Sequence, residues 1–249
     1  MANIFEENAY TKEIETRIKE INEENKTIEL EDTVFYGKSG GQPGDKGEII
    51  ADDQKVEVND TIKTDGSIKN ILENINGLSK NQKIIARINW DKRYKYMQMH
   101  SALHLMCASI SLGVTGGQIG YEKSRLDFND PDKEIKKEEL QEKINALMEE
   151  DHKITYEYID SKILESQPEL VRTMSVKPPN IDGKLRFVKI GNVDFQPCGG
   201  THVRSTKEIG KITIGKIENK GRMNRRVNIL INDQEFDLKI ILYDHFQGY

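Results

Sequence analysis

The first third of the chain alternates between apolar and polar residues over short stretches. Residues 4–60 contain alternating or β-rich pieces broken by Asn and by charged turns, a pattern typical of short strands. The pattern continues through VEVNDTIKTDGSIKN, in which Asp65-Gly66 marks a hairpin turn, and it ends with the strand-like stretch KIIARINW. We therefore predict a small β-rich, barrel-like domain over residues 1–89.

From Trp90 onward the apolar residues follow the period of a helix. A helix over 91–112, followed by a glycine cluster, is predicted by residues at helical spacing: Tyr96, Met99, Leu103, Met106 and Ile110. Further along, KEELQEKINALMEEDH predicts an amphipathic helix and SKILESQPEL a short one. Strands are predicted in SRLDFN, ITYEYID and LRFVKIGNVDF, and in the hairpin formed by GKITIGKIENK and RRVNILIND. Because strands and helices follow one another without a βαβ rhythm, we predict an α+β domain over 90–249 with a mostly antiparallel sheet.

The composition is that of a polar globular protein, with 36% hydrophobic and 32% charged residues among 249. No run of about 18 apolar residues is present, which predicts no transmembrane helix and no membrane partner. The N-terminus lacks the basic and apolar regions of a signal peptide. Two cysteines cannot form a disulfide framework, and we expect a cytoplasmic protein whose thiols are reduced.

The charge is unevenly distributed along the chain. A net charge of -5 argues against a general nucleic-acid coat, and we expect no DNA partner. Residues 216–226 nevertheless carry five cations against one acid, Glu218: Lys216, Lys220, Arg222, Arg225 and Arg226.

Two pairs of residues at equal spacing predict a metal site. His100 and His104 are four residues apart on the predicted helix and share one face. Cys198 and His202 repeat the interval on a loop whose two glycines allow the backbone to fold back. Three imidazoles and a thiolate form the tetrahedral set that zinc favours, and they disfavour magnesium and calcium. We predict one Zn²⁺ per chain, bound by these four residues.

Several other interpretations of these residues were weighed. The two helix histidines could simply be partly buried. Cys107 follows His104 on the same helix face and could be a ligand, although its apolar neighbours favour a buried thiol. His152 and His245 have no partner nearby in the sequence. HSALH lacks the Glu of HExxH, which argues against a zinc peptidase.

The glycine-rich segment FYGKSGGQPGDKG, residues 35–47, leaves three interpretations open. It could be a long hairpin loop, or a phosphate cradle, although no P-loop Lys-Ser/Thr follows the glycines. It could also be backbone that approaches a ligand closely, with Gln42 as a polar contact. Spacing alone does not rank the three.

Together, HSALH, CGGTH and FYGKSGGQPGDKG resemble the AlaX family of free-standing alanyl-tRNA editing proteins, in its medium-sized class. This family is related to the editing domain of alanyl-tRNA synthetase. The resemblance extends through HVRSTKEIGKITIGKIENKGRMNRRV and covers residues 25–230. The editing region of threonyl-tRNA synthetase shares the HxxxH and CxxxH pairs, but GGQP favours the alanyl group. Many relatives have a Pro and an additional Gly where this chain has Gly37 and Ser39.

The resemblance implies that the protein acts in trans as an aminoacyl-tRNA hydrolase at a zinc site. The substrate would be alanine tRNA carrying a wrong amino acid, serine first and glycine second. Thr33 would read the serine hydroxyl, although it could equally be an ordinary strand residue, and Gln42 would orient the ester or a water. The segment after CxxxH would contact tRNA phosphates, unless it is a solvated basic turn, through Lys220, Arg222, Arg225 and Arg226. The main alternative is a non-catalytic, zinc-stabilised tRNA-binding module, and either would be a monomer or a homodimer.

Overall fold

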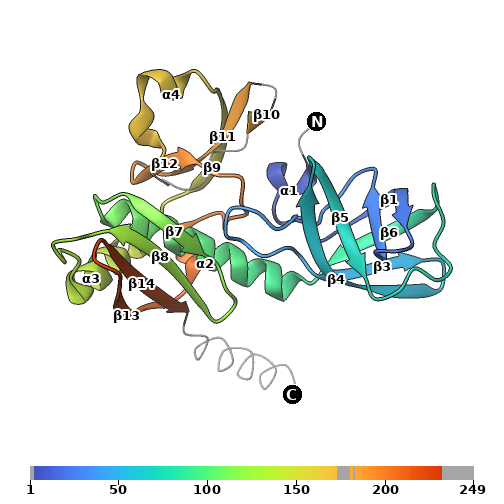
Figure 1. Cartoon of the computed structure of the whole chain (residues 1–249), viewed down its shortest axis with the longest axis horizontal. Helices are drawn as coiled ribbons and strands as arrows, with labels where there is room; N and C mark the ends of the chain where they lie inside the picture. Colours follow the sequence, from blue (N-terminus) through green and yellow to red (C-terminus); the bar gives the residue numbers. More distant parts are fainter. Residues whose placement is uncertain (1–2, 173–179, 182, 232–249) are drawn as a thin grey trace, which may run out of the picture.

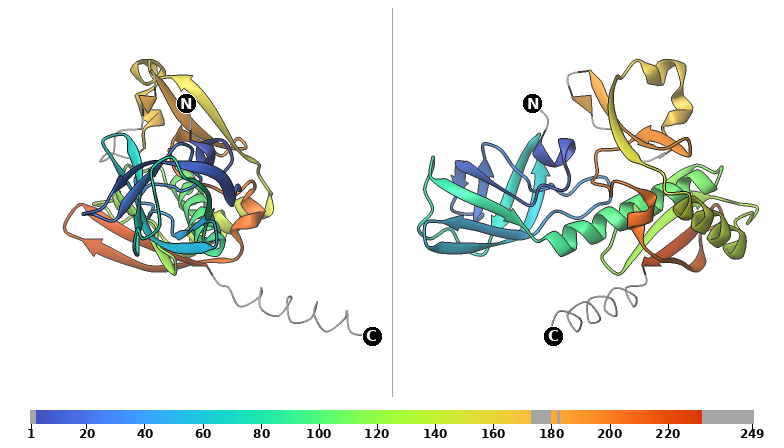
Figure 2. Two further views of the ribbon diagram at one scale, coloured as in Figure 1. Left: turned by 90° about the vertical axis from the view of Figure 1, so that its right-hand side faces the viewer. Right: turned by 180° about the vertical axis from the view of Figure 1, so that it is seen from behind.

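The computed structural model describes residues 3–172, 180–181 and 183–231. A β-barrel and an α+β half lie at the two ends of one long helix, α2 (Trp90–Ser109), as Figures 1 and 2 show. Within the described part, no helix is long and apolar enough to cross a membrane.

The N-terminal half is a closed barrel in the order β1-β2-β5-β4-β3-β6, preceded by a short helix, α1 (Ile4–Glu7). Its strands are β1 (Glu13–Asn22), β2 (Thr27–Leu30), β3 (Gly47–Ala51), β4 (Gln54–Thr64), β5 (Ser67–Leu72) and β6 (Lys83–Ile88). All neighbours pair antiparallel. Alternation fixes which side chains face inward, since the even-numbered residues of β6 are buried and the odd-numbered ones are not. The barrel confirms the predicted β-rich region, and Asp65 and Gly66, both at positive φ, form the predicted turn.

The second half contains two antiparallel sheets and a helical layer. One sheet has the order β13-β14-β8-β7, built from β13 (Ile212–Lys220), β14 (Asn224–Ile231), β8 (Lys123–Asn129) and β7 (Val114–Gln118). In the other, β11 (Lys184–Ile190) pairs with β9 (Ile154–Asp160), β10 (Asn180–Ile181) and β12 (Asp194–Pro197). The predicted α+β class with mostly antiparallel sheets is confirmed.

Helix α2 is buried on nearly every side between residues 97 and 107, because it lies between the barrel loop, the two sheets and α3 (Lys137–Glu149). A helix surrounded in this way needs no single apolar stripe, so its histidines and Arg93 are as buried as its methionines. Asn89 caps its start by accepting a hydrogen bond from the Lys92 N–H, at 3.1 Å. The boundary predicted near Asn89 thus falls between the last barrel strand and this helix.

Two sequence predictions differ in detail from the structure. Helix α2 ends at Ser109 rather than at 112, because Ile110 is extended and its carbonyl accepts a hydrogen bond from Arg172 Nη2 at 2.7 Å. The glycine cluster that follows is the edge strand β7, which pairs with β8. The short helix predicted in SKILESQPEL is divided into α4 (Ile163–Ser166) and the 3₁₀ turn η1 (Pro168–Leu170).

A buried ion pair joins the barrel to helix α2. The Arg93 side chain is fully buried and its guanidinium pairs with the carboxylate of Asp45, with Nε 3.0 Å from each oxygen. Arg93 also donates to the carbonyls of Val34 at 2.7 Å and Ala9 at 3.0 Å, and Asp45 accepts the Tyr36 N–H at 2.6 Å. Every contact ties a segment of the barrel half to the helix that carries both histidines.

We expect the Asp45→Asn substitution to lower the free energy of unfolding by about 3–5 kcal/mol, because it leaves the Arg93 charge buried without a counter-charge. Chemical denaturation measures the change. The control is Glu13→Gln, which removes a partner of Arg87 from an exposed pair whose side chains are 40% and 52% exposed. An exposed pair contributes little, so equal losses in the two variants would contradict the importance given to Arg93.

Candidate metal centre

The two sequence pairs meet in one cluster. His100 and His104 come from successive turns of α2, and Cys198 and His202 from the loop that follows β12. One ligand atom from each of these four residues lies within 4.8 Å of all the others. The Cys198 Sγ lies 3.5 Å from His100 Nε2 and 3.7 Å from His202 Nε2. Bond lengths of about 2.3 Å to sulfur and about 2.0 Å to nitrogen would place tetrahedral S and N ligands about 3.5 Å apart. The spacing therefore fits a tetrahedral metal ion.

The protonation of the cluster also suits a metal. Burial raises the pKa of a thiol, but at Cys198 the charges of His100 and His202, with hydrogen bonds from His100 and His104, lower the pKa well below its ordinary value of 9.0. Burial and the neighbouring His100 lower the pKa of His202 well below 6.5. A thiolate and a neutral imidazole are the forms that bind metal. These four residues could therefore hold a metal ion.

Two carboxylate or amide groups fix the outer faces of the helix histidines. Asp194 Oδ2 lies 2.7 Å from His104 Nδ1 and also accepts the Gln196 Nε2 hydrogen bond at 2.8 Å. Burial lowers the pKa of His104, but Asp194 and the Cys198 sulfur outweigh it and raise the pKa to about 10. Gln42 Oε1 lies 3.1 Å from His100 Nδ1. With both Nδ1 atoms occupied in this way, both Nε2 atoms are directed to the cluster.

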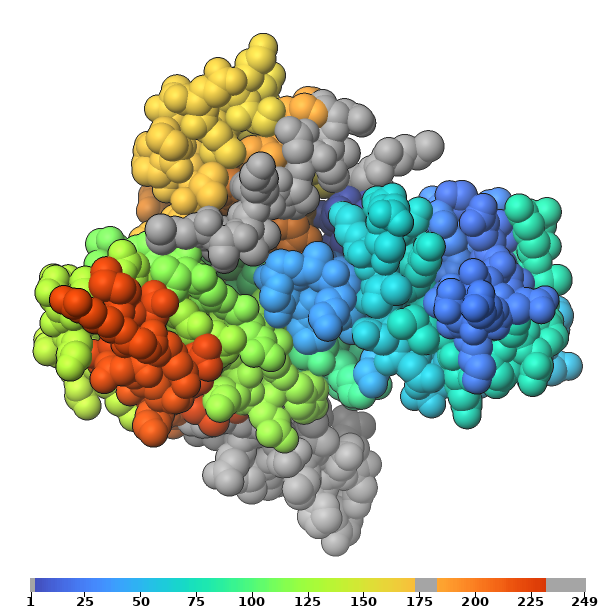
Figure 3. Space-filling model, viewed as in Figure 1, coloured from blue at the N-terminus to red at the C-terminus, as the bar shows by residue number. Residues whose placement is uncertain are grey.

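The glycine-rich segment approaches the cluster through its backbone. Gly40 and Gly41, at φ 55° and 83°, occupy a turn in which Ser39 and Gln42 exchange backbone hydrogen bonds of 2.9 and 3.2 Å. Two successive positive φ angles define a type I′ turn, which glycine adopts without strain. The Gly41 carbonyl then accepts the Ile119 N–H of the β7–β8 connection, at 2.9 Å. Figure 3 shows this segment as pale-blue atoms between the barrel and the green strands.

Gly200 in the CGGTH loop has no room for a side chain. A Cβ at this position would lie 2.1 Å from His100 Cε1 and 2.9 Å from Gln42 Oε1. The loop is held from behind by Arg186, whose Nη1 donates to the carbonyls of Cys198 at 2.7 Å and Gly200 at 3.1 Å. Arg186 is itself buried and stacks on the Tyr156 ring, 3.8 Å from its centroid.

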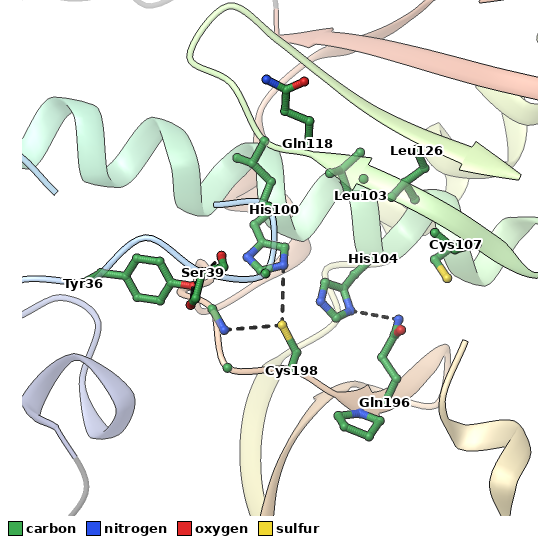
Figure 4. A pocket seen from close by; sticks show the side chains of 18 of the residues that line it. Tyr36, Ser39, His100, Leu103, His104, Cys107, Gln118, Leu126, Gln196 and Cys198 are labelled. Atoms are coloured by element: carbon green, nitrogen blue, oxygen red, sulfur yellow. Dashed lines mark hydrogen bonds between the residues drawn. The ribbon is translucent and has the colours of Figure 1, made fainter. Parts of the chain in front are cut away.

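A cavity of about 400 Å³ opens beside the cluster. Three of the four candidate ligands form part of its wall, as Figure 4 shows for His100, His104 and Cys198. Its barrel side includes Tyr36, Ser39, Gly40 and Gly41, and its sheet side includes Leu103, Cys107, Val114, Gln118 and Leu126. The size and the mixture of an apolar side with a few polar groups are those of a small-molecule site.

The predicted catalytic residues lie behind this wall. Gln42 is 1% exposed, and its amide contacts His100, the Thr201 N–H at 3.1 Å and the Thr201 hydroxyl at 2.9 Å. Thr33 is buried at the start of the glycine-rich loop, and its hydroxyl accepts the Phe35 N–H at 3.0 Å. Neither side chain lines the cavity, so direct contact of either one with a substrate remains a prediction.

The remaining cysteine and histidines are separate from the cluster. Burial raises the pKa of the Cys107 thiol to about 11, and the residue lies beyond His104, away from Cys198 (Figure 4). His152 Nε2 contacts Glu150 at 2.7 Å near the surface. His245 lies outside the described residues.

The four predicted tRNA contacts do not form one patch. Arg226 pairs with Asp127 through two hydrogen bonds of 2.8 and 2.9 Å, and Lys220 pairs with Glu218 at 3.1 Å. Arg225 lines a separate hollow at the start of α3, and its buried Nε has no hydrogen-bond partner among the described residues. Arg222 is exposed in the β13–β14 turn. Ion pairing therefore occupies two of the four cations.

Sequence reasoning missed Asp194, Gln196 and Arg186. Asp194 and Gln196 precede Cys198 by four and two residues, and their spacing put them on one face of a predicted strand that leads to the metal ligand. That signal was available. Arg186 lies on the adjacent strand β11, and only the pairing of β11 with β12 brings it to the loop.

Comparison with known proteins places this site in the class of synthetase-related domains. The family model described as "Threonyl and Alanyl tRNA synthetase second additional domain" matches residues 185–228, which include Cys198 and His202. The model described as "tRNA synthetases class II (A)" matches residues 3–92, which include the barrel.

Individual relatives narrow the class. The alanyl-tRNA editing protein AlaX-M of Methanosarcina barkeri is 33% identical over 90% of this chain and 96% of its own length. AlaX-L of Pyrococcus horikoshii is 31% identical over 88% of this chain and 55% of its own length. The alanine–tRNA ligase of Pyrococcus abyssi is 30% identical over 86% of this chain but only 24% of its own length. The chain belongs to the AlaX family of alanyl-tRNA editing proteins, as its motifs predicted.

We expect Gly200→Ala to abolish metal binding, because the added Cβ displaces the His100 ring. Metal analysis of the purified proteins measures the loss. The control is Gly116→Ala, also in the cavity wall, where the Cβ would lie 3.5 Å from the nearest atom, Asp127 Oδ2. Retention of metal by the Gly200 variant would show that the loop does not constrain the cluster.

We expect Asp194→Ala to weaken metal binding by about 10- to 100-fold, because His104 loses the acceptor that orients its ring. Competition with a chromogenic chelator measures the affinity. Glu150→Ala removes another carboxylate that contacts a histidine, outside the cluster and 56% exposed, and should leave the affinity unchanged. Equal affinities in all three proteins would be the contrary result.

Proposed function

We propose that the protein is a zinc-dependent hydrolase that removes a wrong amino acid from alanine tRNA, serine in the first place and glycine in the second. The observation that carries this proposal is the convergence of His100, His104, Cys198 and His202 in the wall of a 400 Å³ cavity, in a chain of the AlaX family. An aminoacyl ester has a carbonyl to be polarised and needs a water for its hydrolysis, and zinc supplies both kinds of activation.

The surrounding residues orient the ligands. Asp194 and Gln42 hold the two helix imidazoles from their outer sides, and Arg186 holds the loop that carries the thiolate. Gln42 then acts through His100 rather than on the ester. The apolar sheet side of the cavity excludes water around the ester, which strengthens the electrostatic effect of every charge in the site.

A site of this kind addresses an error that a synthetase pocket corrects poorly. A pocket shaped for alanine rejects an additional hydroxyl weakly, whereas a second site can hydrogen-bond that hydroxyl and thereby select serine. Thr33 was the residue predicted to do so. Its hydroxyl is occupied by a backbone N–H and faces away from the cavity wall, so the geometry gives the prediction little support.

The tRNA is proposed to be bound in trans, in the cytoplasm, through phosphate contacts. Among the four predicted residues, Arg222 and Arg225 are free of ion pairs with described residues, whereas Lys220 and Arg226 would have to exchange Glu218 and Asp127 for phosphates. We therefore expect charge removal at Arg222 and Arg225 to weaken binding more than removal at the other two.

The test combines metal analysis with deacylation of Ser-tRNA(Ala), Ala-tRNA(Ala) and Thr-tRNA(Thr). The protein should contain about one zinc per chain and deacylate the first substrate only. His104→Ala and Cys198→Ala should lose the zinc and reduce deacylation more than about 100-fold, since loss of a ligand is worse than loss of its outer partner. Cys107→Ala, which changes a cavity thiol outside the cluster, should keep both properties.

Two results would contradict the proposal. Zinc-free protein with full activity would exclude the metal from the reaction. Zinc-loaded protein that deacylates none of the three substrates but still binds tRNA would favour the alternative, a non-catalytic RNA-binding module.

A further inference from the structure

We propose that Ser39, supported by Tyr36, is the residue that recognises the serine hydroxyl of the substrate. The inference rests on the proposed editing function and concerns its specificity. Ser39 and Tyr36 supply the side-chain hydroxyls among the described residues that line the cavity beside the metal cluster. In Figure 4 the Tyr36 ring points toward Ser39, and both lie on the side of the cavity where His100 and Cys198 meet.

The two hydroxyls form a chain that ends in the cavity. The Tyr36 hydroxyl lies 2.6 Å from Ser39 Oγ and 3.0 Å from the Ser39 carbonyl oxygen. Tyr36 is 2% exposed and its pKa is raised, chiefly by burial, so the phenol keeps its proton and acts as the donor. When it donates to Ser39 Oγ, the proton of the Ser39 hydroxyl is left to point elsewhere. Ser39 is partly exposed and lies in the cavity wall, so the cavity is where that proton finds a partner.

The position of Ser39 is fixed relative to the metal ligands. Ser39 and Gln42 are the two ends of the type I′ turn and exchange backbone hydrogen bonds, and the Gln42 side chain holds His100. The turn therefore links the hydroxyl directly to the imidazole it faces. A hydroxyl on such a turn has little freedom to follow a misplaced substrate, which is a requirement for discrimination.

The arrangement explains how alanine would be rejected. With a seryl ester bound, the Ser39 proton is donated to the substrate hydroxyl, and the bond from Tyr36 strengthens it cooperatively. With an alanyl ester, a methyl group lies in that position and a buried donor is left without an acceptor. Thr33, whose hydroxyl already accepts the Phe35 N–H outside the cavity, offers no comparable donor.

The experiment measures kcat/KM of the zinc-loaded protein on Ser-tRNA(Ala) and, at high enzyme concentration, on Ala-tRNA(Ala). We expect Ser39→Ala to lower the ratio of the two values about tenfold, the equivalent of one hydrogen bond. The alanyl reaction should stay the same or become faster. Tyr36→Phe should lower the ratio less, since Ser39 Oγ remains. Thr33→Val, the matched hydroxyl removal outside the cavity, should leave the ratio unchanged.

Zinc content is measured for every variant, because a merely structural role for Ser39 would disturb the turn and with it His100. Unchanged zinc with a lowered ratio supports the inference. A parallel loss on both substrates, an unchanged ratio, or a loss confined to the Thr33 variant overturns it while leaving the editing function intact. Failure of the unsubstituted protein on both substrates would instead overturn the editing function itself.

Discussion

The buried pair of Arg93 and Asp45 is the contact on which the arrangement of this protein depends. Arg93 lies two helical turns before His100, and Asp45 ends the glycine-rich loop that carries Gln42. A charge that is fully buried tolerates few alternative positions, because any displacement leaves it unpaired. The pair therefore fixes the loop on the helix, and Gln42 reaches His100 as a consequence.

The site is thus assembled at the junction of two structural units. Helix α2 provides two ligands, the loop after β12 provides two, and the barrel provides the amide that orients one of them. Edge strand β7 completes the cavity and is bonded to the glycine-rich loop through Gly41 and Ile119. Because each unit contributes a different part, neither the barrel nor the α+β half alone would form the cavity wall.

Glycine carries much of the specificity of this assembly. At Gly200 a side chain would occupy the space of the His100 ring, and at Gly44 and Gly47 a Cβ would lie 1.9 and 2.1 Å from backbone oxygens of the barrel. Three short motifs that seem unrelated in the sequence are therefore parts of one packing problem. The glycines allow close backbone approach, and the polar residues between them fill the few remaining positions around the imidazoles.

The sequence alone determined the α+β class, the β-rich N-terminal region, the four candidate ligands and the family, because periodicity and paired spacing are local properties. It could not rank the readings of FYGKSGGQPGDKG or separate the cations of 216–226. Those depend on long-range pairing: the β13–β14–β8 register brings Asp127 to Arg226, and the Arg93–Asp45 pair turns Gln42 toward His100 and away from the cavity. Tertiary structure decided which polar side chains face a substrate, since a side chain's partner across the fold is not written in its neighbours along the chain.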